Sequence, residues 1–129
     1  MMSIDRFEEI LEQLAEELPE EFYDQLNGGI IVDSGYPLHP ADENGDLYIM
    51  GEYRTDPALG KYIVIFYGSF CQVMDTEDEQ EWIQEMRDVL RHEFRHHMEG
   101  RAGLRDLEIW DEAQIAAYRA HIRREREPS

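Results

Sequence analysis

Two histidines and a glutamate lie close together in the segment RHEFRHHMEG, residues 91–100. His92 and His96 are four residues apart, so on a helix both rings can reach one zinc ion at about 2.0–2.1 Å. Glu93 follows the first histidine, where its carboxylate can take a proton from an attacking water and return it to a leaving amine. Zinc would supply an activated water, because it lowers the pKa of water toward ~7. The pattern predicts zinc-dependent peptide hydrolysis, with Glu93 as the general base.

The motif falls within a stretch that is predicted to be one long helix. We expect this helix to begin at a capping box formed by Thr76 and Glu79 and to end near Gly100. At 100° per residue, Glu93 falls near the middle of an apolar face and the two histidines fall along its edge. A carboxylate aimed at an apolar face needs a partner, and a metal site at the rim of the core would supply one. The face itself consists of Trp82, Met86, Val89 and Leu90.

His97 adds a third imidazole, directly after the motif. It points toward the centre of the apolar face, which predicts a core histidine or a group that supports the metal ligands from behind. The alternative is that His97 is itself a ligand. Its natural helical partner would then be Glu93, and the site would lose its general base.

A catalytic zinc site keeps three protein ligands and an open fourth position. Asp111 is the preferred third ligand, because it begins a predicted helix that could fold over the metal. Glu112 and Glu108 are the alternatives, whereas Glu99 shares the motif helix and is poorly placed to turn back. Imidazole and carboxylate ligands also accept other divalent ions, so the sequence does not choose the metal used in the cell.

The charge of the chain restricts its partners. The formal net charge is −18, and residues 1–90 carry all of it, with 22 acidic and four basic residues. Such a surface repels phosphate backbones and anionic membranes, so neither nucleic acid nor a membrane is an expected partner. Cys71 is the only cysteine, and no apolar signal core or membrane-length apolar run is present. We therefore expect a cytoplasmic protein without disulfides.

The remaining elements predict an α+β fold in a single domain, residues 1–129, with a small, mostly three-stranded sheet packed with the motif helix and flanking helices. Apolar residues at steps of three and four predict a first helix that Ser3 caps and Pro19 ends, and Pro19 can open a short second one. The expected strands are residues 30–32, 47–53 and 62–67; a last helix is expected at residues 111–124, and residues 121–129 are expected to be a frayed tail.

Several segments, taken together with the motif, resemble a known family. LPEEFYDQL followed by IIVD, then MGEYR, YIVIFYGSF and finally EWIQEMRDVLRHEFRHHM occur in the order seen in the small bacterial zincin-like metallopeptidases, or minimal zincins. The resemblance covers roughly residues 4–120. It implies a compact zincin-like fold, zinc on His92 and His96, Glu93 as the base and Asp111 as the matching third ligand. The connection MEGRAGLRDLEIW is longer than in many members.

Three functions are consistent with these features. The first is a zinc-dependent metallopeptidase that cleaves a peptide or a flexible protein segment, in which a strand at the edge of the sheet, residues 62–67 or 47–53, pairs with the substrate. The second is a non-catalytic zinc-containing module whose acidic surface binds a basic partner protein. The third is a metal-free interaction protein in which the motif is accidental. The sequence indicates neither the cleavage preference nor the oligomeric state.

Overall fold

A computed structural model describes residues 1–102 of the chain. These residues form, in chain order, α1 (Ile4–Glu16), the 3₁₀ helix η1 (Glu20–Tyr23), β1 (Gly29–Asp33), β2 (Gly51–Asp56), β3 (Gly60–Phe66), α2 (Tyr67–Val73) and α3 (Glu79–Ala102). The predicted α+β class with a three-stranded sheet is confirmed. The predicted helix at residues 111–124 and the tail at 121–129 lie outside the described residues. Within residues 1–102, no helix is both long and apolar enough to cross a membrane.

The sheet is mixed, with strand order β1-β3-β2. β3 is the central strand and runs parallel to β1 and antiparallel to β2. A tight turn joins β2 to β3, where an Asp56 side-chain oxygen accepts hydrogen bonds from the backbone N–H groups of Ala58 and Leu59 at 2.7 and 2.9 Å. Gly60 closes this turn at φ +78°, a conformation that side chains disfavour. In the described part of the chain, β2 is therefore an edge strand, whereas β3 pairs with a strand on each side.

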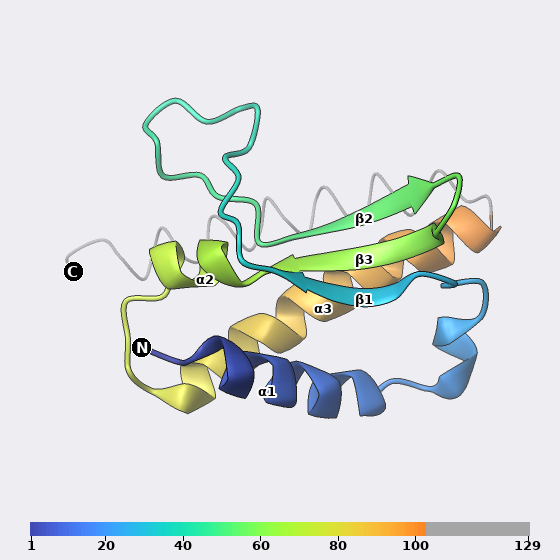
Figure 1. Ribbon diagram of the computed structural model, residues 1–129, viewed down its shortest axis with the longest axis horizontal. Helices are drawn as coiled ribbons and strands as arrows, with labels where there is room; N and C mark the ends of the chain where they lie inside the picture. Colours follow the sequence, from blue (N-terminus) through green and yellow to red (C-terminus); the bar gives the residue numbers. More distant parts are fainter. Residues whose placement is uncertain (103–129) are drawn as a thin grey trace, which may run out of the picture.

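Two strand predictions were wrong at their boundaries. The strand expected at residues 47–53 begins only at Gly51, because the preceding residues pair with their own loop. Tyr48 forms a β-bridge with Leu38, and the Ile49 N–H donates to the Pro37 carbonyl at 2.8 Å. Figure 1 shows the middle of this loop between β1 and β2 extending away from the sheet and the helices.

The strand expected at residues 62–67 ends one residue early, because Tyr67 begins α2. This short helix was not expected, and it lacks a side-chain cap. Gly68 has a different role, since a Cβ atom there would lie 2.3 Å from the Ser34 carbonyl oxygen and 2.5 Å from that of Gly35. Glycine therefore lets α2 pack directly on the chain that leaves β1.

The core lies between the sheet and the helices. Figure 1 shows α1 and α3 on the same side of the sheet, where α3 packs against β2, β3 and α1. The predicted cap of α1 is confirmed, because the Arg6 N–H donates to Ser3 Oγ at 3.2 Å. The core draws on α1, β3, α2 and α3, and its fully buried members include Phe7, Ile10, Ile63, Ile65, Phe70, Trp82, Met86, Leu90 and Phe94.

The predicted cap of the motif helix was wrong, and Gly100 does not end the helix. α3 begins at Glu79, and Asp78 fills the capping position because its Oδ1 accepts a hydrogen bond from the Gln80 N–H at 2.9 Å. Thr76 lies too early and instead accepts from the Asp78 N–H, while Glu79 forms an ion pair with Arg6 at 2.6 Å. The helix also passes through Gly100 and continues to Ala102.

Candidate metal centre

The His-Glu-x-x-His motif lies in the second half of α3, where the helix packs against β2 and β3. The predicted orientation of this helix is confirmed: Glu93 is only 5% exposed, and Leu90 and Phe94 beside it are 1% exposed. His92 and His96 are partly exposed, as expected for residues at the edge of the buried face. The helix thus directs a carboxylate inward and two imidazoles along the rim.

The two imidazoles face each other through equivalent nitrogens. His92 Nε2 and His96 Nε2 are 3.2 Å apart, and the two ring planes meet at 85°. Glu93 completes the group, since one ligand atom from each of the three side chains lies within 4.8 Å of the others. Three groups that can bind a metal therefore converge on one small volume at the surface of the helix.

This arrangement fits a divalent metal ion. Two imidazole nitrogens that bind one zinc tetrahedrally at about 2.0–2.1 Å lie about 3.3 Å from each other. The observed separation of 3.2 Å agrees with that spacing. Nitrogen donors with a nearby carboxylate suit zinc and also other first-row divalent ions.

Gly51, the first residue of β2, is packed against Glu93. A Cβ atom built on this glycine would lie 2.9 Å from Val89 Cγ1 and 3.3 Å from Glu93 Cγ. The absence of a side chain thus lets the strand approach α3 closely enough to press on the glutamate. The motif MGEYR contains this glycine, and its place in the resemblance was the available signal, but the sequence did not indicate which residue it would contact.

His97 is completely buried behind the motif. Its Nε2 lies 2.8 Å from the carbonyl oxygen of Asp24, which can only accept, so Nε2 carries the hydrogen. Its Nδ1 is then free to accept the hydroxyl hydrogen of Tyr53, at 2.9 Å. Burial lowers the pKa of His97 and keeps it neutral, which agrees with these two bonds. Neither bond involves His92, Glu93 or His96, and the alternative in which His97 binds the metal together with Glu93 gains no support from this geometry.

Glu99 is a buried carboxylate on the same helix, with an exposed fraction of 3%. One of its oxygens lies 3.6 Å from His96 Nδ1, the ring nitrogen opposite the one that faces His92. Glu99 is absent from the converging group of three, in agreement with its poor placement as a ligand. Its burial and its contact with His96 were not anticipated.

The candidates for the third metal ligand lie outside the described residues. They are Asp111, Glu112 and Glu108, and each stays a prediction. The described part of the chain supplies the two histidines and the glutamate and brings them together.

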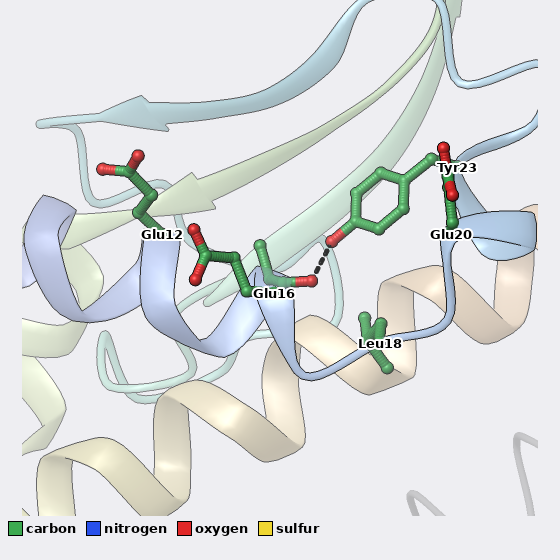
Figure 2. A pocket seen from close by; sticks show the side chains of 6 residues that line it. Glu12, Glu16, Leu18, Glu20 and Tyr23 are labelled. Atoms are coloured by element: carbon green, nitrogen blue, oxygen red, sulfur yellow. Dashed lines mark hydrogen bonds between the residues drawn. The ribbon is translucent and has the colours of Figure 1, made fainter.

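A separate hollow lies between α1 and η1, away from the motif residues. Its floor is apolar, formed by Ala15, Leu18 and Tyr23, and the Tyr23 hydroxyl donates a hydrogen bond to the Ala15 carbonyl. Three glutamates surround it, and Figure 2 shows how they are spread along α1 and η1: Glu12, Glu16 and Glu20. This hollow is shallow, and neither a histidine nor a cysteine is among the described residues that line it.

The α+β fold and the His-Glu-x-x-His helix together define a zincin-like protein. The model of the zincin-like metallopeptidase family matches residues 46–116, and the chain belongs to that family. A solved structure, a conserved hypothetical protein from T. thermophilus, is similar, with 32% sequence identity and a TM-score of 0.67. The similarity covers 78% of this chain and 98% of that one. No curated protein shows significant similarity to the chain.

Proposed function

We propose that this protein is a zinc-dependent peptidase in which His92 and His96 hold the metal and Glu93 is the general base. The observation that supports it most directly is the 3.2 Å separation of the two Nε2 atoms, with a carboxylate in the same cluster. Membership in the zincin-like metallopeptidase family supports the same interpretation. Zinc, when bound, would polarise the scissile carbonyl and lower the pKa of the attacking water.

The side chain of Glu93 is suited to move a proton. It is 5% exposed, and Gly51 of β2 packs against it, so its position is restricted on the strand side. In the proposed reaction its carboxylate takes the proton from the attacking water and then gives it to the leaving amine. We propose Asp111 as the third ligand, with Glu112 and Glu108 as alternatives.

The sheet topology removes one of the two strands that were candidates for holding the substrate. β3 already pairs with β1 and β2 on its two sides, which removes residues 62–67 as a candidate. β2 pairs with β3 alone among the described strands, and it begins at the residue that contacts Glu93. We propose that an extended peptide, or a flexible segment of a protein, adds to β2 and places its scissile bond beside α3.

Metal content and turnover test this proposal together. We expect elemental mass spectrometry to find about one zinc per wild-type chain. His92→Ala should contain none, because α3 then supplies only one of the two imidazole ligands. Glu93→Gln should keep the zinc and cleave a flexible peptide library about 10²–10⁴-fold more slowly, since it loses only the proton acceptor. Cleavage that persists in Glu93→Gln, or that survives chelation, would rule out this mechanism.

A second candidate function is a zinc-containing module that binds a basic partner without turnover. The acidic excess of residues 1–90 and the glutamates around the apolar hollow favour it. It would take lysine or arginine side chains, whose aliphatic stems suit an apolar floor and whose charged ends suit carboxylates. This function predicts bound zinc, no cleavage in any library, and a complex that weakens as salt is raised. A cytoplasmic location stays a prediction.

A further inference from the structure

Glu99 is buried in a place where a carboxylate is costly. It is 3% exposed, although it belongs to one of the residue types that are almost never fully buried without a partner. Removing a carboxylate from water costs several kcal/mol unless opposite charge or hydrogen-bond donors compensate. A buried carboxylate is kept beside groups of matching chemistry, and the His96 ring is one group that lies next to Glu99.

His96 lies between two partners, one at each ring nitrogen. Its Nε2 faces His92 Nε2 at 3.2 Å, and its Nδ1 faces a Glu99 oxygen at 3.6 Å. When Nε2 donates its lone pair to a metal, the ring hydrogen must be on Nδ1. The N–H group then points toward the side of the ring on which Glu99 lies.

Metal-binding histidines usually donate their second ring N–H to a carboxylate, a carbonyl or a water, and this bond fixes the tautomer and the orientation of the ring. Here the carboxylate comes from the next turn of the same helix, three residues after the histidine. Closing the gap from 3.6 Å to hydrogen-bond length needs only small side-chain rotations, because both residues are held on one rigid element.

We propose that Glu99 is the positioning residue of this site: it accepts the Nδ1–H of His96, selects the tautomer that presents Nε2 to the metal, and strengthens metal binding without being a ligand. This inference rests on the proposed function only in that it requires a metal at His92 and His96. It gives a task to a residue that lies just beyond the motif and outside the converging group of three.

The test is the zinc affinity of three proteins, measured by competition with a chromophoric chelator. Glu99→Gln keeps the shape of the side chain and removes its charge, and we expect it to bind zinc about 10–100-fold more weakly than wild type. Glu81→Gln is the matched control, because Glu81 is an exposed glutamate at the start of the same helix, and its affinity should stay within about twofold of wild type.

Two further measurements separate positioning from a structural role. Without metal, Glu99→Gln should melt no lower than wild type, whereas the rise in melting temperature on adding zinc should be smaller. In zinc-loaded wild type labelled with ¹⁵N-histidine, His96 should show a slowly exchanging Nδ1–H that is lost or shifted in the variant. The wild-type part of this readout does not depend on how the variant folds.

The possible failures are distinguishable. A wild-type protein that binds no zinc would overturn the proposed function, and this inference would fall with it. Wild type that binds zinc while Glu99→Gln binds it equally well would overturn the inference alone. The inference would also be overturned if Nδ1 of His96 carried no hydrogen in the zinc-loaded protein. It would be overturned as well if Glu99→Gln lost stability without metal along with its zinc affinity.

Discussion

The two halves of α3 bury different kinds of side chain against the same fold. In the first half the fully buried residues are Trp82, Met86 and Leu90, all apolar. In the second half the buried face includes Glu93, Glu99 and His97, with Phe94 among them. One helix therefore supplies apolar packing at one end and groups that can bind metal or move protons at the other.

This contrast indicates how a small domain divides its tasks. The first half stabilises the fold through burial of apolar surface, and its residues satisfy every local rule for a core. The second half breaks those rules by placing ionisable groups where apolar ones would be more favourable. Such exceptions are expected where function, rather than stability, sets the residue type. The two halves should therefore respond differently to mutation and to zinc.

The largest effect is expected in the first half. Trp82 is 1% exposed and packs on Phe7 and Phe70, with ring centroids 6.4 and 6.2 Å away. Trp82→Ala should lower the free energy of unfolding by about 3–5 kcal/mol, because it leaves a cavity in the core. Urea unfolding with and without zinc measures this loss, which should be the same in both. A loss that appears only with zinc would contradict the division between the halves.

The second half should respond mainly through the metal. His92 is partly exposed, so His92→Ala should change the metal-free stability by no more than about 0.5 kcal/mol. The same variant should lose the stabilisation by zinc, which is about 2.7 kcal/mol at a zinc concentration roughly 100 times the Kd. Thermal unfolding across a zinc titration measures both quantities. Equal stabilisation of variant and wild type by zinc would place the metal elsewhere.

Gly51 connects β2 to the second half, and two glycine substitutions sharpen that link. Gly51→Ala would bring a methyl group within 2.9 Å of Val89 and 3.3 Å of Glu93, so we expect a loss of about 1–3 kcal/mol and slower turnover. Gly100→Ala is the control, because a Cβ there would come no closer than 3.9 Å to the Lys61 and Tyr53 side chains. It should be neutral or stabilise by up to about 1 kcal/mol. Chemical denaturation and peptide cleavage rates compare the two; similar losses would refute a specific role for Gly51.

The smallest effect contrasts the buried carboxylates of α3 with an exposed one. Backbone hydrogen bonds, chiefly from Leu47 and also from Gly45 and Asp46, hold the pKa of Asp42 below its usual value. The folded loop is therefore favoured fully above the unfolded pKa of about 3.9, and this contribution is lost as pH falls through the lower folded pKa. NMR titration of the Leu47 amide should show a midpoint below that value, absent in Asp42→Asn. A midpoint at or above it would contradict these bonds.

The buried face in the first half of α3 and the fold class could both be predicted from the sequence, because both depend on periodic burial. Steps of three and four placed Trp82, Met86 and Leu90 on one face, and the same count placed Glu93 and His97 inward. The family resemblance is confirmed. The pairing of His92 with His96 depends only on the helical repeat, so this part of the candidate site could be predicted from the sequence.

Contacts between distant segments could not be predicted in the same way. Tyr53 bonds to His97 across 44 positions, and Gly51 presses on Glu93 from another element. Both depend on how closely the sheet approaches the helix, a distance that no local pattern encodes. The cap of α3 was predicted wrongly for a related reason. Thr76 and Asp78 are both suitable capping residues, and the ion pair between Arg6 and Glu79 favours a helix that starts after Asp78. No local sequence pattern predicted α2, because its glycine is required by the close approach of the chain after β1.

The mixed sheet also has a consequence for the order of folding. β2 and β3 are joined by a tight turn and can pair early, because closing a short loop costs little chain entropy. The long loop and all of β2 lie between β1 and β3 in the chain. Their parallel ladder therefore closes a larger loop and is expected to form more slowly. The hairpin that carries Gly51 is thus expected to exist before the rest of the sheet. The strand on which we place the substrate would act first as a nucleus for the fold, and only afterwards as a binding edge.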